Sequence, residues 1–330
     1  MIPIRDTIPS RSYPVVNTAI IIINVLVYLL ELSKGDGLNI FIYVYGLVPA
    51  RYTVTEVSNY FSFAQQGFAW VSFMFLHGGF LHLLGNMWSL YIFGDNVEEH
   101  LGSARYLAFY LLGGIISGLA HFILNPYSNA PTIGASGAIA GVMGAYFILH
   151  PRAKILTLIP IIIIPWFVEI PAFFFLGFWF VMQFINAAGS GAASSGIAWW
   201  AHIGGFVGGI ILLKIFDFMP ADGVTRKLKQ MTTKKKSHRL QVIRPTGPPD
   251  TSDLFGTIAI TPFEALTGTS KLVNIPWGFH KRLVRVAVPA GVNEGTTLRL
   301  RGMGKQMPGD QRGDLLLKVV TAEKTIEPHL

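Results

Sequence analysis

Six long apolar stretches constrain this sequence more than any other feature. They cover approximately residues 15–32, 81–93, 106–124, 133–149, 172–187 and 199–216. A helix that crosses the hydrocarbon of a bilayer needs about 20 mostly apolar residues, and the second stretch approaches that length if it extends toward Glu98. Because 51% of the residues are hydrophobic and only 13% are charged, a soluble globular enzyme is excluded. The sequence predicts an all-α polytopic membrane protein, a six-helix bundle, over its first two thirds.

Two apolar segments need separate interpretations. Residues 155–168 are interrupted by Pro160 and Pro165, so we expect a non-helical or interfacial crossover there instead of a seventh span. The first apolar stretch follows Arg5 and Arg11 but is longer than the core of a signal peptide. We therefore expect it to be a retained membrane span.

The positive charges predict how the spans are oriented. Loops on one side contain Arg5, Arg11, Arg105, Arg152 and Lys154, and the sixth span is followed by a basic cluster of Arg226, Lys227, Lys229, Lys234, Lys235, Lys236 and Arg239. Loops on the other side contain only Lys34 and Arg51. Because lysine and arginine are retained in the cytoplasm, both termini are expected there, with a bacterial cytoplasmic membrane as the location. The basic cluster predicts contact with anionic lipid and not with nucleic acid.

Polar side chains within membrane spans are candidate functional residues, because hydrocarbon offers them no water. Four fall at a similar depth, near the outer ends of their spans: His82, Asn86, Ser136 and His202. A hydroxyl, an imidazole and two further donors in one layer are what acyl transfer needs. Ser136 is the candidate nucleophile and His202 the candidate general base. His82, Asn86 and the backbone N–H of Ser136 are the candidate donors to an oxyanion.

Small residues accompany the serine and the histidine. They are Gly134, Gly137, Gly141, Gly205 and Gly209, at a spacing that places most of them on one face of each helix. A purely structural interpretation remains open here: the glycines pack helices closely, and Ser136 bonds back to its own helix.

Other enzyme classes are excluded by missing residues. The chain has no cysteine, so it has no thiolate metal site and no cysteine nucleophile. It has no His-Glu-x-x-His motif either, and we expect no metal and no cofactor. Asp217 follows His202 by 15 residues, about 22 Å along a helix axis, so no acid completes a triad. The expected catalytic unit is a dyad.

These residues resemble the rhomboid family of intramembrane serine proteases. The resemblance rests on His82-Leu83-Leu84-Gly85-Asn86 after His77, on Gly134-Ala135-Ser136-Gly137, on Ala201-His202-Ile203-Gly204-Gly205 and on Gly46-Leu47-Val48-Pro49-Ala50. It covers about residues 10–218. It implies a Ser136–His202 dyad that cleaves membrane-anchored proteins in or next to their transmembrane helix. By analogy, residues 188–198 would form a mobile cap over the site and the fifth span a lateral gate.

The sequence departs from common rhomboid patterns at two places. Phe68 and Ala69 stand where many members have Trp-Arg, and Ala140 stands where some members have an aromatic residue that stacks on the catalytic imidazole. The alternative function is a catalytically silent rhomboid-like chaperone or adaptor that binds transmembrane helices and cytoplasmic tails.

The last third of the chain has a different composition, and the sequence predicts three parts: a membrane domain at 1–219, a basic, proline-containing linker at 220–252 and a small all-β sandwich at 253–330. The β-region resembles the C-terminal substrate-binding domain of DnaJ-type co-chaperones, through segments 260–265, 288–292, 298–300 and 313–315. The His-Pro-Asp signature of a J domain is missing. Such a domain could bind an extended peptide or protein tail by adding a strand to a sheet edge, and a purely structural appendage is the open alternative.

Overall fold

Two compact units make up the chain. The computed structural model describes residues 1–10, 12–161, 164–189, 198–220, 223, 228, 231–232, 240–243, 245–248, 251–277, 280–305 and 312–321. The units are Met1–Lys234 and Lys235–Leu330. Each unit has a hydrophobic core of its own. The linker expected at 220–252 therefore extends too far, because Leu240–Val242 form a strand of the second unit. The basic cluster lies outside the described residues.

Helices occupy all six apolar stretches of the first unit. They are α1 (Val15–Leu32), α6 (Phe80–Leu101), α7 (Ser103–Leu124), α8 (Ser136–Leu149), α9 (Ala172–Gly189) and α10 (Trp199–Phe218). Within the described residues, four of them, α1, α7, α9 and α10, are long and apolar enough to span a membrane alone. A fifth span results if Phe63–Phe75 and Phe80–Leu101, bent by 78°, count as one broken span. All six predicted helices are thus present, and four or five of them meet the length and composition of a complete span.

The exception is α8, which has only 14 residues. At 1.5 Å per residue it is about 21 Å long, shorter than the roughly 30 Å of bilayer hydrocarbon. It begins at Ser136, three residues later than expected, because residues 131–135 run without helical structure along a polar cavity. Non-helical backbone is tolerated at membrane depth where it lines such a cavity.

Glycines let α8 and α10 pack almost backbone to backbone. A Cβ added to Gly209 would lie 2.1 Å from the carbonyl oxygen of Gly141, and a Cβ added to Gly205 would lie 2.1 Å from that of Gly137. Both distances are far below van der Waals contact, so neither position accepts even alanine without movement. This close approach places the N-terminus of α8 next to the N-terminal turn of α10.

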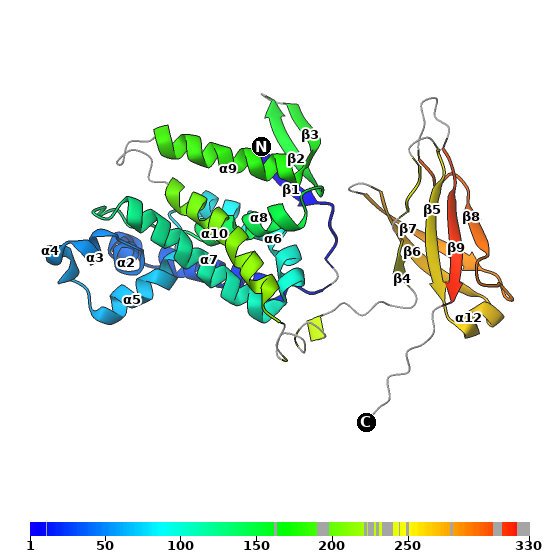
Figure 1. Cartoon of the computed structure of the whole chain (residues 1–330), viewed down its shortest axis with the longest axis horizontal. Coiled ribbons are helices and arrows are strands. Elements are labelled where there is room, and N and C mark those ends of the chain that lie inside the picture. The colour runs from blue at the N-terminus through cyan, green and yellow to red at the C-terminus, as the bar shows by residue number, and fades with distance from the viewer. Residues whose placement is uncertain are drawn as a thin grey trace. The chain divides into compact units, whose positions relative to one another are not determined.

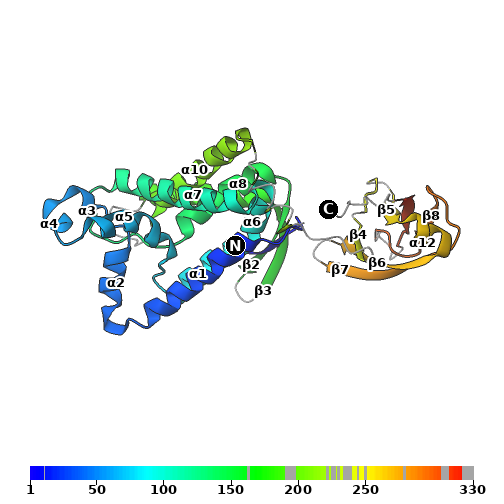
Figure 2. The ribbon, with the colours of Figure 1, turned by 90° about the horizontal axis from the view of Figure 1, so that it is seen from below.

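Short helices form the connection between α1 and α6. They are α2 (Leu38–Tyr45), α3 (Ala50–Thr53), α4 (Thr55–Ser58) and α5 (Phe63–Ser72), and they gather at one end of the bundle (Figures 1 and 2). Buried Arg51 holds this layer together: its guanidinium donates to the carbonyls of Tyr43 and Val44 at the end of α2 and lies 3.6 Å from the ring centre of Phe61. Many rhomboid sequences have Trp-Arg at the positions of Phe68 and Ala69. This chain also has a buried arginine in the loop, but at position 51.

A three-stranded sheet closes the opposite end of the bundle (Figure 1). The proline-broken segment expected to be a crossover is non-helical, as predicted, but it forms a hairpin of β2 (Lys154–Ile161) and β3 (Ile164–Pro171). An unexpected strand, β1 (Ile2–Asp6), pairs antiparallel with β2. The prolines are tolerated because Pro160 and Pro165 face each other near the end of the hairpin.

The second unit is a small sandwich, as predicted. One sheet contains β4 (Leu240–Val242), β6 (Thr269–Trp277) and β7 (His280–Val288); the other contains β5 (Leu254–Ile260), β9 (Leu315–Thr321) and β8 (Thr297–Leu300). Alternate residues of both sheets form one core, including Ile258, Val273, Val286 and Leu317. A short helix, α12 (Pro262–Thr267), begins with a capping box between Thr261 and Glu264.

Candidate active site

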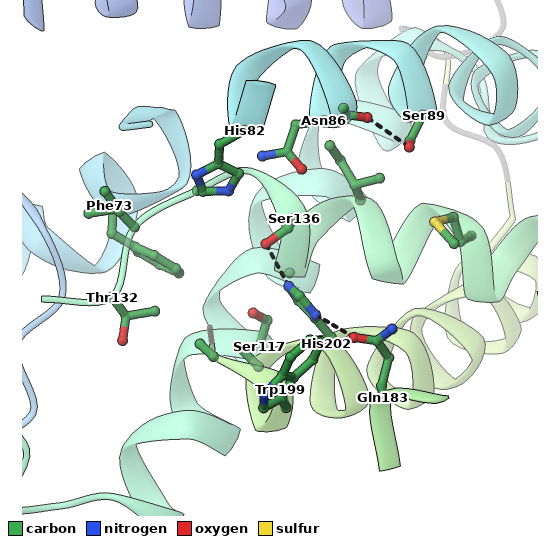
Figure 3. Close-up of a pocket in the computed structure, with 18 of the residues that line it drawn as sticks. Phe73, His82, Asn86, Ser89, Ser117, Thr132, Ser136, Gln183, Trp199 and His202 are labelled. Carbon is green, nitrogen blue, oxygen red and sulfur yellow. Dashed lines mark hydrogen bonds between the residues drawn. The ribbon is translucent and has the colours of Figure 1, made fainter. Parts of the chain in front are cut away.

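A cavity of about 540 Å³ opens inside the helical bundle, where α6, α7, α8, α9 and α10 meet. Its lining includes all four polar residues that the sequence singles out: His82, Asn86, Ser136 and His202. Figure 3 shows His82 and Asn86 on one side of Ser136 and His202 on the other. Side chains separated by up to 120 positions in the sequence therefore share one polar space within an apolar bundle.

Ser136 and His202 are in direct contact. Ser136 is the first residue of α8, and His202 lies in the first turn of α10. The Ser136 Oγ and the His202 Nε2 are 2.8 Å apart, a normal hydrogen-bond distance. With neutral histidine, the hydroxyl donates to Nε2. A serine bonded in this way has a base positioned to take its proton.

His82 faces the serine from α6. The backbone N–H of Gly78 donates to its Nδ1 at 3.4 Å, so the proton of neutral His82 belongs on Nε2. This Nε2 approaches Gly134, where an added Cβ would lie 2.8 Å from it. Gly134 also has a φ of +121°, which non-glycine residues rarely adopt. Glycine is needed here both for the backbone conformation and for the close approach of the imidazole.

Asn86 lies one turn after His82 on the same face of α6. Its side chain is 8% exposed, and its Nδ2 has no hydrogen-bond partner among the described residues. A buried amide donor without an acceptor is costly, which suggests that a group entering the cavity completes it. At the start of α8 the N-cap residue is Ala135, which provides no side-chain cap. The first N–H groups of that helix, from Ser136 onward, have no acceptor within the helix.

Gln183 is a further polar residue of the cavity, and the sequence interpretation missed it. It lies on α9, is 5% exposed, and its Oε1 is 2.8 Å from the Nδ1 of His202. The same rule that singled out the other four could have found it, since it is a glutamine within a mostly apolar helix. Asp217, the acid judged too distant, bonds to His100 at 2.7 Å instead.

Aromatic rings flank the imidazole of His202. Trp179 of α9 lies 5.9 Å from it between ring centres, and Trp199 of α10 lies 6.0 Å away, edge to face. Ala140 stands where some rhomboid sequences have an aromatic residue, and its side chain is buried in α8. The rings beside His202 thus come from the fifth and sixth expected spans and not from the helix of the serine.

The expected cap over the site and the expected absence of a metal can be compared with the described residues only. Residues 190–197, most of the expected cap, lie outside the described residues. Among the residues that the structure describes, no group of three or more His, Cys, Asp or Glu side chains could hold a metal ion.

The fold and the site together define a polytopic helical membrane protein with a hydrogen-bonded serine–histidine pair in an internal cavity. Residues 64–216 match the family model of the rhomboid domain, and residues 240–324 match that of the DnaJ C terminal domain. The chain therefore contains a rhomboid domain followed by a DnaJ C terminal domain.

Similar proteins come from bacteria, plants and fungi. The chain is 34% identical to the rhomboid protease GluP of Bacillus subtilis over 160 residues, 46% of this chain and 27% of that protein. It is 37% identical over 83 residues to RHOMBOID-like protein 5 of Arabidopsis thaliana, 24% of this chain and 27% of the relative. Rhomboid protein 1, mitochondrial, of Saccharomyces cerevisiae is 29% identical over 141 residues, 42% of this chain and 38% of its own length. The chain thus spans well under half of each of these relatives.

Proposed function

We propose that this protein is an intramembrane serine endopeptidase that cleaves membrane-anchored proteins in or next to their transmembrane helices. The observation that carries the proposal is the 2.8 Å contact between the Ser136 Oγ and the His202 Nε2 within a polar cavity of the bundle. The rhomboid domain and the similarity to GluP, a protein named as a protease, support the same reaction.

The proposed reaction starts with attack of the Ser136 Oγ on the carbonyl carbon of the scissile peptide. His202 Nε2 takes the hydroxyl proton as the new carbon–oxygen bond forms. The same proton then passes to the leaving nitrogen as the carbon–nitrogen bond breaks, which leaves an acyl-enzyme. Water, deprotonated by His202, attacks this ester, and the Ser136 oxygen takes that proton back as its bond to the carbonyl carbon breaks and the second product leaves.

Three donors are proposed to stabilise the negative charge that develops on the carbonyl oxygen. They are the Nε2–H of His82, the Nδ2–H of Asn86 and the backbone N–H of Ser136. Because the Gly78 N–H donates to His82 Nδ1, the proton of neutral His82 is on Nε2, the nitrogen that approaches Gly134. The Nδ2 of Asn86 has no hydrogen-bond partner among the described residues. The N-terminus of α8 adds its positive dipole end. Each such donor contributes about 3–4 kcal/mol to transition-state stabilisation.

Cleavage of a model membrane protein with a helix-destabilised transmembrane segment, reconstituted in liposomes with the full chain, tests this function. Ser136→Ala and His202→Ala are each expected to abolish cleavage. If both variants cleave like the parent, the dyad is wrong. If the parent does not cleave but retains the model substrate in pull-downs, the catalytically silent adaptor is the better description.

We further propose that the DnaJ C-terminal domain binds extended tails of substrates or partners. Strand β5 offers no open edge, because Gln241 bonds to both backbone groups of Ala259 and Thr246 pairs with Phe255. Strand β7 pairs only with β6 among the described strands, and Leu283 on it is 60% exposed. An added strand along 280–288 would obtain backbone hydrogen bonds and a side-chain contact there.

Removing residues 240–330 tests this second role. The truncated protein is expected to cleave a tail-less substrate at the parental rate and a substrate with a cytoplasmic tail more slowly than the parent does. Equal effects on both substrates would contradict tail binding.

A further inference from the structure

We propose that Gln183 is the positioning residue for His202, so that the chain operates a Ser136–His202–Gln183 relay whose third member is a neutral amide on α9. The proposal rests on the proposed serine chemistry and adds a residue to it. Figure 3 shows the three side chains in line, with both hydrogen bonds of the imidazole drawn.

The orientation of the Gln183 amide follows from its two contacts. Its Nε2 donates to the backbone carbonyl of Trp179 at 3.2 Å, one turn earlier on α9. A carbonyl only accepts, so the NH₂ end of the amide must point toward it. The Oε1 end is thereby directed at His202 Nδ1, 2.8 Å away. The reverse orientation would set two oxygens against each other.

An acceptor at Nδ1 determines the protonation state of the base. Neutral imidazole carries one proton, and Gln183 holds it on Nδ1. Nε2 then has its lone pair free to accept from the Ser136 hydroxyl, as the 2.8 Å distance requires. The opposite tautomer would put N–H against the hydroxyl and leave the serine without a base.

Within the described part of the chain, no acidic side chain bonds to the imidazole of His202, whose two ring nitrogens contact Gln183 and Ser136. Asp217 is bonded to His100 at the far end of α10. Burial of Gln183 at 5% exposure means that water competes little for its carbonyl oxygen. An amide suits such an apolar position, because an unpaired carboxylate there would be strongly disfavoured. The orienting function of a triad acid is thus performed without a buried charge.

The same helix supplies a second contact with His202. Trp179 precedes Gln183 by one turn on α9, and its ring lies 5.9 Å from the imidazole. Ser136, His202 and Gln183 lie on α8, α10 and α9 respectively, so the base is oriented only while α9 packs against α10. The helix expected to act as a gate therefore also takes part in aligning the base.

The test uses the full chain in liposomes with the model substrate described above. Gln183→Met keeps the length of the side chain but removes the acceptor. We expect kcat to fall roughly 10- to 100-fold, by analogy with the loss of the hydrogen-bond partner of a metal-bound histidine, with KM at the parental value. Val181→Ile, on the exposed face of α9 at 52% exposure, is the matched control and should behave like the parent.

A second variant separates positioning from mere packing. Gln183→Glu keeps an acceptor of the same shape, and its carboxylate favours the imidazolium. It should recover most of kcat and move the acid limb of the pH–rate profile. The other titratable groups acting on His202, His82 on α6 and His121 on α7, are unchanged in these variants. A parental kcat for Gln183→Met, or an unshifted profile for Gln183→Glu, would overturn the proposal.

A measurement without substrate makes the result independent of the proposed function. In protein labelled with ¹⁵N-histidine, NMR should show the His202 proton on Nδ1 in the parent and a mixture of tautomers in Gln183→Met. A His202 that carries its proton on Nε2 in the parent would refute the relay. Failure of the proposed function has a different signature: the parent and Ser136→Ala would then be equally inactive, whatever the tautomer.

Discussion

Single residues in the cavity show how unsatisfied groups indicate chemistry. Asn86 is buried at 8% exposure with an unpartnered Nδ2, whereas Ser89, one turn further along α6, donates to the carbonyl of Gly85 at 2.8 Å. Both residues line the same cavity. The hydroxyl of Ser89 is therefore committed to its own helix, whereas the amide of Asn86 is left for an incoming oxygen.

Asn86→Ala is accordingly expected to lower kcat on the model substrate by roughly 10²–10³, the loss for one oxyanion donor. We expect this loss because the variant lacks one hydrogen bond to the oxyanion in the transition state. The ground-state affinity for substrate should therefore change little. Steady-state kinetics in liposomes measure the effect, and Ser89→Ala is the control from the same helix. Comparable kcat values for the two variants would remove Asn86 from the oxyanion site.

Among the elements, α8 and α10 are the pair whose contact the site depends on most. Gly209 lies against the backbone of Gly141, with an added Cβ only 2.1 Å from its carbonyl oxygen. Gly177 on α9 is also helical, but its added Cβ would meet only the ring of Phe147, at 3.9 Å. The close packing of α8 and α10 therefore requires glycine at position 209, whereas no packing contact requires glycine at position 177.

Gly209→Ala should destabilise the bundle by about 1–3 kcal/mol, since the helices must separate to admit the methyl group. Gly177→Ala should be neutral or stabilising by up to about 1 kcal/mol, because alanine has the higher helix propensity. The unfolding midpoint in detergent compares the two. A stability of Gly209→Ala equal to that of Gly177→Ala would show that the α8–α10 contact is looser than described.

In the second unit, Asp314 connects strand β9 to the turn after β8. Its carboxylate accepts from the backbone N–H of Gly302 at 2.7 Å and from the guanidinium of Arg299. The Gly302 hydrogen bond and then the Arg299 side chain hold the pKa of Asp314 below its usual value. Because the folded-state pKa is the lower one, Asp314 stabilises the fold above its ordinary pKa near 4 and loses this effect as the pH falls below it.

Asp314→Asn should therefore increase hydrogen exchange in 297–300 and 315–321 at pH 7, with the difference from the parent shrinking as the pH falls below about 4. Glu294→Gln removes a charge from an exposed site in the same unit and serves as the control. A difference that persists unchanged at acid pH would mean that charge on Asp314 is not the cause.

At the scale of the whole molecule, the two ends of the first unit differ in character. Helices α2–α5 gather at one end and the β1–β3 sheet at the other (Figure 2). The sheet end carries Arg5, Arg152 and Lys154, and the chain continues from α10 into the second unit. The distribution of lysine and arginine supports the proposal that the sheet end and both termini face the cytoplasm.

The chain has no cysteine, so single cysteines report this orientation without background. Asn59→Cys lies in the helical layer and Asn293→Cys in the β-domain, both at exposed positions. In intact bacterial spheroplasts that express the protein, a membrane-impermeant maleimide should label Asn59→Cys only, and lysis should make Asn293→Cys reactive. The reverse pattern would place the termini outside.

The sequence alone determined the helical segments and the four polar residues at one depth, Ser136, His202, His82 and Asn86. It also determined the sandwich of the last third. Apolar length and local periodicity carry this information within each segment. Strand β4, strand β6 and the β1–β3 sheet were not predicted. Residues 240–242 were assigned to the linker, and proline and lysine interrupt β6. Strand β1 acquires its structure only by pairing with residues 155–158.

Only the tertiary structure determined which side chains of the site are in contact. The rotation of α9 brings Gln183 and Trp179 to His202, and the approach of α10 to α8 joins Ser136 to His202. Gln183 indicates which face of α9 turns toward the bundle, but sequence spacing does not say which residue it meets there. Contacts across 19 and 66 positions depend on how whole helices pack, and packing is a property of all their side chains together.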